Sequence, residues 1–257
     1  EIYPPKTIIG NLLPEYKEQF GFDLQVVLPA THDTASAVLA VPEPDDDTIY
    51  ISSGTWSLIG TEIYSPICTN EALKNNFTNE GGFEHRYRFL KNIMGLWMIQ
   101  EVKRLYMDKY SYEDLVDLAL EAEHFRSIVD VNDVRFLKPK NMIEEIQKFC
   151  KETEQEVPTT PGEIAKCIYD SLVESYSIAV EQLENILQKQ FHQINIIGGG
   201  AQNNYLNQLI AAKTKKEVIA GPIEATAIGN IVAQMIALGE ISSVEEARRK
   251  IKNSFQI

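Results

Sequence analysis

Cysteine and basic residues are both scarce in this chain of 257 residues. The three cysteines, Cys68, Cys150 and Cys167, include no Cys-x-x-Cys pair, so the sequence predicts neither a zinc site nor a dense disulfide framework. Lys and Arg number 24 against 37 Asp and Glu, which gives a net charge of -13. Such a chain repels nucleic-acid phosphates and has no basic stripe to follow a nucleic-acid backbone. A small anionic ligand stays possible, because backbone N–H groups and helix N-termini bind phosphate whatever the net charge.

Long apolar runs are missing too. No stretch approaches the roughly 20 apolar residues that a membrane-spanning helix needs, and no charged start leads into an apolar segment. With reduced thiols as the default, we expect a cytoplasmic protein with no membrane partner. A hydrophobic content of 44% is nevertheless enough for a packed core in one large domain or two small ones. Residues 2–5 read like the middle of a loop, so we expect the chain to be part of a longer protein.

The first third of the chain predicts a strand, a helix and a hairpin. A short apolar run at 26–28 indicates a strand, and 33–41 is a compact helical stretch ended by prolines. Runs at 49–51 and 56–59, separated by a polar tip, predict a β-hairpin. We interpret the acidic triplet at 45–47 as a solvated turn rather than a metal site, because prolines and a strand flank it.

The longest predicted helix begins at a capping box formed by Thr160 and Glu163, with a proline at its first position. Apolar residues follow at helical spacing as far as Leu187, which is typical of a core stripe rather than a cofactor site. Further helices are predicted over 93–107, near 112–122 and 141–150, and from a second capping box at 243–246. Residues 109–158 carry no recognisable chemistry.

The last third alternates strands and helices in the α/β manner. Strands are predicted at 194–197 and 218–220, and helices from Asn204 and over 224–238. Three glycines at 198–200 lie between a strand and a helix, which is the general arrangement for cradling a nucleotide. The segment matches neither the Rossmann nor the P-loop fingerprint, so a plain strand-to-helix turn is an equally good interpretation.

Two other segments carry candidate chemistry. Asp33 lies between His32 and Thr34 where a strand meets a helix, and a carboxylate there can take a proton from a substrate hydroxyl. This segment alone favours a simpler role, in which Asp33 only caps the helix. The hairpin tip at 52–55 offers a glycine and the hydroxyl of Thr55 to a phosphate, although by itself it is an ordinary turn.

Several segments, taken together and in order, resemble the rhamnulokinases, a group within the FGGY family of sugar kinases. These segments are 32–37, 50–58, 79–82, 87–97, 196–204, 207–208 and 219–225. The resemblance implies an α/β fold of the actin-like (ribonuclease H-like) ATPase kind, with a mixed sheet flanked by helices. It further implies that residues 1–21 are a linker from an N-terminal domain and that 22–257 form the C-terminal nucleotide-binding domain.

The resemblance also implies an activity, the transfer of the ATP γ-phosphate to the 1-hydroxyl of L-rhamnulose, with Mg2+ held largely through ATP. Asp33 would be the general base. The residues that hold the sugar would be His32, Thr34 and Asn92. The residues that contact ATP would be Thr55, Gln100, Gly198, Gly199, Gly200 and Asn203. On the sequence pattern alone, Asn92 would be a helix N-cap and Gln100 an exposed polar residue about two helical turns beyond it.

Members of this family carry an N-terminal domain with its own phosphate-binding hairpin and most of the sugar pocket. No such segment precedes residue 1, so we expect this chain to be weakly active or inactive alone and to need that domain as its partner. Two other functions stay open. One is a kinase for another deoxyketose such as fuculose, although the segment around Asn92 favours rhamnulose. The other is a non-catalytic nucleotide-binding or regulatory module with the actin-like fold, against which Asp33 argues.

Overall fold

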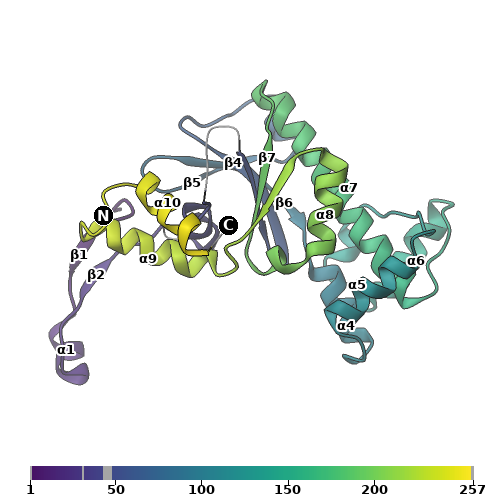
Figure 1. The fold of residues 1–257 in the computed structure, drawn as a ribbon, viewed down its shortest axis with the longest axis horizontal. Coiled ribbons are helices and arrows are strands. Elements are labelled where there is room, and N and C mark those ends of the chain that lie inside the picture. The colour runs from purple at the N-terminus through teal and green to yellow at the C-terminus, as the bar shows by residue number, and fades with distance from the viewer. Residues whose placement is uncertain (1, 31, 43–47, 256–257) are drawn as a thin grey trace.

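A computed structural model describes residues 2–30, 32–42 and 48–255 of the chain. Its centre is a six-stranded sheet in the order β5-β6-β4-β3-β7-β8 (Figure 1). The strands are β3 (Thr48–Ser53), β4 (Trp56–Ile63), β5 (Thr78–Gly81), β6 (Tyr87–Met94), β7 (Gln193–Ile197) and β8 (Glu217–Ala220). β3, β7 and β8 pair in parallel, whereas β4 pairs antiparallel with β3 and β6, and β5 with β6. The predicted mixed sheet is therefore confirmed, and the predicted turn at 45–47 lies outside the described residues.

Helices cover both faces of this sheet. They are α2 (Asp33–Leu39), α3 (Asn70–Lys74), α4 (Trp97–Leu105), α5 (Tyr112–Glu121), α6 (Met142–Glu152), α7 (Pro161–Leu187), α8 (Asn204–Thr214), α9 (Ala225–Ala237) and α10 (Val244–Phe255), with short 3-10 turns η1 (Val134–Phe136) and η2 (Gly199–Gln202). Figure 1 shows α9 and α10 on one side of the sheet and α7 and α8 on the other. Within the described residues, no helix is both long and apolar enough to cross a membrane.

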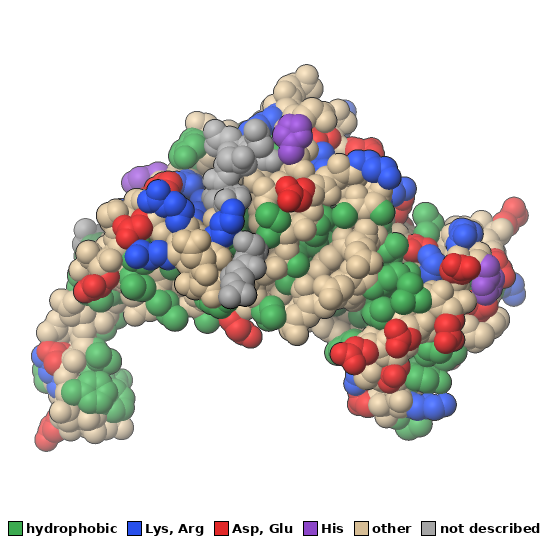
Figure 2. Space-filling view, viewed as in Figure 1, with side chains coloured by type: hydrophobic (Ala, Val, Ile, Leu, Met, Phe, Trp, Pro, Cys, Tyr) green, Lys and Arg blue, Asp and Glu red, His purple; other side chains and the backbone are tan. Residues whose placement is uncertain are grey.

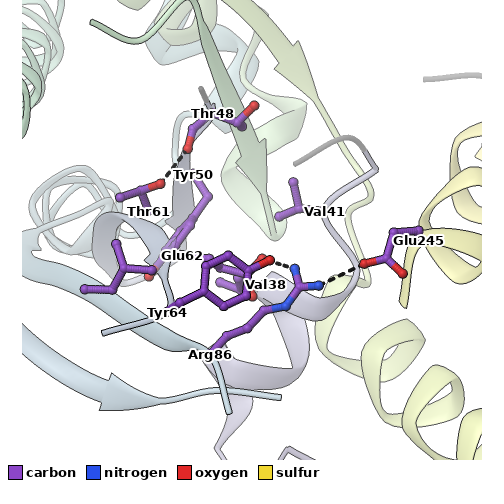
Figure 3. Close-up of a pocket in the computed structure, with 10 residues that line it drawn as sticks. Val38, Val41, Thr48, Tyr50, Thr61, Glu62, Tyr64, Arg86 and Glu245 are labelled. Carbon is purple, nitrogen blue, oxygen red and sulfur yellow. Dashed lines mark hydrogen bonds and ion pairs between the residues drawn. The ribbon is translucent and has the colours of Figure 1, made fainter. Parts of the chain in front are cut away.

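The two-residue period of the strands sends alternate side chains into two separate cores. Ile49 and Ile51 of β3 belong to the larger core, which contains residues of α4, α5, α6, α7 and α8. Tyr50, between them, belongs to the smaller core, which contains residues of α2, α9 and α10. Figure 3 shows Tyr50 together with Val38 of α2 among the residues that line a pocket on this side of the sheet. The sheet therefore separates a large helical layer from a small one, and each layer meets the same strands from its own side.

An arm formed by residues near the N-terminus projects away from this body (Figure 1). It consists of β1 (Ile8–Asn11) and β2 (Gln25–Val27), which pair antiparallel, with α1 (Pro14–Phe20) between them. The stacked rings of Tyr16, Phe20 and Phe22 are about half exposed, and Figure 2 shows hydrophobic side chains gathered at the end of this arm. The predicted domain boundary after residue 21 falls inside the arm, because β1 precedes it and β2 follows it. That boundary stays a prediction.

The predicted helix over 93–107 is wrong at its beginning. Ile93 and Met94 end the strand β6, and the helix α4 begins at Trp97. Apolar residues at this point fit either period over a short window, and pairing decides between them. β6 pairs along its whole length with β4, which ties this segment into the sheet. The other predicted helices agree with α2, α5, α6, α7, α8, α9 and α10 to within a few residues.

The capping box predicted for the longest helix is present at the start of α7. The Thr160 hydroxyl accepts the Glu163 N–H at 3.2 Å, and the Glu163 carboxylate accepts the backbone N–H groups of Thr159 and Thr160. The Thr159 bond is the main cause that holds the pKa of Glu163 below its usual value. A lowered folded pKa means that this contribution to stability is present above the unfolded pKa, and is lost as the pH falls through the folded value.

Thr160→Ala should therefore lower the free energy of unfolding by about 1 kcal/mol, because one amide of the first helical turn loses its acceptor. Chemical denaturation at pH 7 measures this loss. The exposed substitution Glu181→Ala, in the middle of the same helix, is the control and should change stability by less than about 0.5 kcal/mol. An equal loss in both variants would contradict the assigned role of the cap.

Candidate functional site

Asp33 is exposed to solvent at the start of α2, a helix whose other residues are buried. The six residues that follow Asp33 in α2 are buried, whereas His32 and Asp33 are exposed. The N-cap residue is His32, whose Nδ1 accepts the Thr34 N–H at 3.3 Å. The interpretation in which Asp33 caps the helix is therefore wrong, and its carboxylate is not used as the cap. Thr34 is itself buried, with 7% of its surface exposed, in contrast to its two neighbours.

Close packing against α9 fixes the position of α2. A Cβ atom at Gly229 would overlap the carbonyl oxygen of Ser36, so only glycine permits this approach of the two backbones. The Ser36 hydroxyl donates to Asn230 Oδ1 at 2.8 Å, and the Thr226 hydroxyl donates to the Asp33 carbonyl oxygen at 3.2 Å. The backbone that carries the exposed carboxylate is thus held by the first turn and the middle of α9.

The hairpin between β3 and β4 is held at its tip by the start of α4. The Leu96 N–H donates to the Gly54 carbonyl at 3.0 Å, and the Trp97 N–H donates to the Thr55 carbonyl at 3.1 Å. The Thr55 hydroxyl donates to Gln100 Oε1 at 3.3 Å. Gly95 allows the approach, because a Cβ atom there would lie 2.6 Å from the Trp56 carbonyl carbon. Thr55 and Gln100 are therefore in contact, although 45 residues separate them in sequence.

The glycine loop after β7 packs directly on the end of β3. Gly198 has a φ of 84°, a conformation that favours glycine, and a Cβ atom there would lie 2.9 Å from the Ser53 carbonyl oxygen. A Cβ atom at Gly200 would overlap the Ser53 side chain. Asn203 then caps α8, with its side-chain oxygen accepting the Leu206 N–H at 3.0 Å. The loop and the hairpin tip are consequently adjacent.

Asp33 lies at the same edge of the sheet as these two turns. Parallel strands end at a common edge, so the hairpin tip after β3, the glycine loop after β7 and the start of α9 after β8 share it. Thr226, in the first turn of α9, contacts the Asp33 backbone. Ligand sites in open α/β sheets occur at this carboxyl edge.

Asn92 lies on strand β6, so its interpretations as a helix N-cap and as part of the helix that carries Gln100 are wrong. It is exposed and pairs with Leu58, which packs in the smaller core together with α2. By strand alternation Asn92 faces the α2 side of the sheet, whereas Gln100 lies on the other side. The predicted sugar contacts and the predicted ATP contacts therefore occupy opposite faces, and the hairpin tip lies between them.

A cleft of about 620 Å³ opens on the side of the larger core. The predicted ATP contacts that line it are Gln100, Gly199, Gly200 and Asn203, and Gly54 of the hairpin tip lines it as well. Its remaining wall comes from α4, α5, α7 and α8, and includes Tyr112, Glu113, Val116, Asp117, Tyr169 and Tyr205. The described residues of this lining include no Lys or Arg. The cleft can thus offer backbone, amide, hydroxyl and aromatic groups to a ligand, but no fixed positive charge.

Two tyrosines of the cleft, the buried Tyr169 and the half-buried Tyr205, are neutral at physiological pH. Burial raises the pKa of Tyr169 to about 12, although the Asn203 side chain acts in the opposite direction. Burial, helped by the nearby Asp170, also raises the pKa of Tyr205 to about 12. The two rings meet edge to face with centroids 5.4 Å apart. They form an aromatic wall of the cleft beside Asn203 and the glycine loop.

Residues 49–238 match the family described as the FGGY family of carbohydrate kinases, C-terminal domain. The chain belongs to this family. It is 60% identical over 257 residues to a rhamnulokinase of Halalkalibacterium halodurans and 53% identical over 254 residues to that of Bacillus subtilis. These matches cover 100% and 98% of the chain but only 55% and 52% of the relatives, so the chain spans about half their length. The resemblance to FGGY kinases, and to rhamnulokinases among them, is confirmed.

Solved FGGY kinases have the same fold as this chain. Gluconate kinase from Lactobacillus acidophilus has a TM-score of 0.73 at 17% identity, over 100% of this chain and 54% of that one. Glycerol kinase from Plasmodium falciparum, solved with ADP, has a TM-score of 0.63 at 11% identity, over 96% of this chain and 49% of that one. At these identities the likeness shows the fold alone, which confirms the actin-like α/β architecture.

The FGGY domain also contains cleft residues that the sequence did not predict. Residues 109–158 carry no recognisable motif, yet α5 contributes Glu113 and Asp117 to the cleft, and α7 contributes Tyr169. One local signal was present, since Ser111 and Asp114 form a capping box that marks the start of α5. That signal gives the position of the helix in the sequence, but the face it turns to the cleft depends on tertiary packing.

Proposed function

We propose that the full-length protein transfers the γ-phosphate of ATP to the 1-hydroxyl of L-rhamnulose. The relatives named rhamnulokinase are 43–60% identical to the chain, and they align with 96–100% of it. The candidate site residues all lie inside these alignments. Because the chain spans about half the length of those relatives, this activity belongs to the whole protein, and we expect little turnover from the chain alone.

The observation that carries the proposal is the exposed carboxylate of Asp33, on a buried helix, at the carboxyl edge of the sheet. In phosphoryl transfer a catalytic carboxylate accepts the proton of the attacking hydroxyl and orients that oxygen toward the phosphorus. Asp33 takes this role. Its backbone is fixed by α9, so the position of the base is set before substrate binds.

The residues proposed to hold the sugar lie with Asp33 on the α2 side of the sheet. His32 uses Nδ1 to accept the Thr34 N–H, so Nε2 of the neutral ring carries the proton and can donate to a sugar oxygen. Asn92 is exposed on the α2 side and offers an amide that both donates and accepts. Thr34 is buried next to Asp33, and its role in holding the sugar is the least direct of the three.

The residues proposed to contact ATP lie in the cleft or at its edge. Gly198 and Gly200 bring the loop backbone against Ser53 at the end of β3, and Gly199, where a Cβ atom would meet no other atom, leaves its backbone open to a phosphate. Thr55 and Gln100, already in contact, offer a hydroxyl and an amide beside the hairpin tip, and Asn203 offers its amide at the start of α8. The glycerol kinase solved with ADP is a structural neighbour, which agrees with a nucleotide in a fold of this kind.

We propose that Mg2+ reaches the site on the phosphate oxygens of the nucleotide. The described residues contain no group of three or more His, Cys, Asp or Glu side chains that could hold a metal, and the cleft lining has no basic side chain. An ion bound by phosphate oxygens would neutralise charge that the chain leaves uncompensated.

Purified full-length protein should phosphorylate L-rhamnulose with a kcat/KM at least about tenfold higher than for L-fuculose. Coupled detection of ADP release gives the rates, and phosphorus NMR of the product identifies the oxygen that carries the phosphate. A preference for L-fuculose would overturn the choice of ketose but leave a sugar kinase. ADP release with neither ketose would overturn the kinase assignment for both substrates.

A further inference from the structure

The end of the cleft formed by α5 is acidic. Glu113 and Asp117 both line the cleft, and both are exposed. They are four residues apart, so they lie one turn above the other on the same face of the helix. Neither carboxylate makes a hydrogen bond or an ion pair within the described part of the chain. Figure 2 shows acidic side chains gathered over the region where Figure 1 has α4 and α5.

The opposite end of the cleft favours anions. The first turn of α8, next to the glycine loop, contains no acidic residue, so its helix dipole and the N–H groups that Asn203 does not cap attract negative charge. The first turn of α5 is different, because Glu113 and Asp114 lie in it and the Ser111 capping box uses its N–H groups. Lys103 approaches the Tyr112 ring but is ion-paired with Asp108. A polyphosphate therefore belongs at the glycine-loop end.

This polarity fixes the direction of a bound nucleotide, and the inference rests on the nucleotide site proposed above. With the phosphates at Gly199 and Gly200, the nucleoside extends toward α5. An uncharged vicinal diol is a group that two unpaired carboxylates bind well, since each hydroxyl can donate a charge-assisted hydrogen bond. We propose that Glu113 and Asp117 accept hydrogen bonds from the ribose 2′- and 3′-hydroxyls and thereby select ribonucleotides over deoxyribonucleotides.

The test compares the affinities of the full-length protein for ADP and for 2′-deoxy-ADP, measured by isothermal titration calorimetry at fixed salt and Mg2+. The unmodified protein should bind ADP about tenfold more tightly, the discrimination expected of a hydrogen bond to a charged acceptor. The double substitution Glu113→Ala with Asp117→Ala should reduce that preference to less than about twofold. It should also weaken the binding of 2′-deoxy-ADP, by less than that of ADP, because the 3′-hydroxyl that this nucleotide retains loses its acceptor. Alanine is the best helix former, so α5 keeps its helix in this variant.

The matched control is Glu121→Ala with Glu123→Ala, which removes the same charge from exposed positions at the last residue of α5 and just beyond it, outside the cleft lining. It should keep the tenfold preference. Equal tightening of both nucleotides in the Glu113 and Asp117 variant would mean that the acids only repel phosphate, and would overturn the inference. Equal affinities in the unmodified protein would overturn it too while leaving the nucleotide site standing, whereas failure to bind either nucleotide would remove the site and the inference together.

Discussion

Asp33→Asn should lower kcat for ketose phosphorylation by about 10² to 10⁴-fold, the contribution typical of a general base. The amide has the shape of the carboxylate but cannot take the proton of the attacking hydroxyl. His32, not Asp33, caps α2, so the change should leave the helix and the thermal midpoint essentially unaltered. Affinity for ADP should also stay the same, because the cleft lies on the other side of the sheet. Steady-state kinetics with the full-length protein, together with calorimetric ADP titration, measures both quantities.

The control for this experiment is Asp108→Asn, an exposed carboxylate whose partner is the Lys103 ammonium. Exposed ion pairs contribute little, so this variant should keep both kcat and stability. If Asp33→Asn retained more than about a tenth of the original kcat, the assignment of Asp33 as the base would be wrong. If it lost ADP binding as well, Asp33 would act on the nucleotide rather than on the sugar.

Gly229→Ala should lower the free energy of unfolding by about 1–3 kcal/mol and should also reduce kcat. In an unhindered helix this substitution stabilises by up to about 1 kcal/mol, so a loss is the opposite of what helix propensity predicts. The added methyl group would overlap the Ser36 carbonyl oxygen and push α2 away from α9. Because Asp33 is at the start of α2, the same displacement moves the carboxylate away from the attacking hydroxyl.

Chemical denaturation and steady-state kinetics of the same preparation separate the two effects. Gln234→Ala, an exposed position further along α9, is the control and should change neither stability nor kcat appreciably. A Gly229→Ala variant that is more stable than the unmodified protein would show that α2 and α9 are not in the contact described. A less stable variant with unchanged kcat would show that the position of Asp33 does not depend on α9.

The sequence was most informative where one local pattern was enough. The capping box at Thr160 predicted the start of α7, and the glycines at 198–200 predicted the end of the strand β7. Both predictions agree with the structure. The segment 93–107 failed, because an apolar run of this length suits a strand or a helix, and only pairing with β4 selects the strand up to Met94. The acidic wall of the cleft could not be predicted, since Glu113 and Asp117 follow a helical pattern typical of any solvated face.

The glycine loop rests on the Ser53 backbone, and the hairpin tip that follows Ser53 is bonded to the first turn of α4. The glycine loop, the hairpin tip and the start of α4 are thus in contact with one another, although Gly198 and Gly54 are far apart in the sequence. Because these contacts tie the loop, the hairpin tip and the start of α4 to one another, we expect their mutual distances to change little when a ligand binds. On the proposed function, a movement that brings nucleotide and sugar together would then come from outside these three turns.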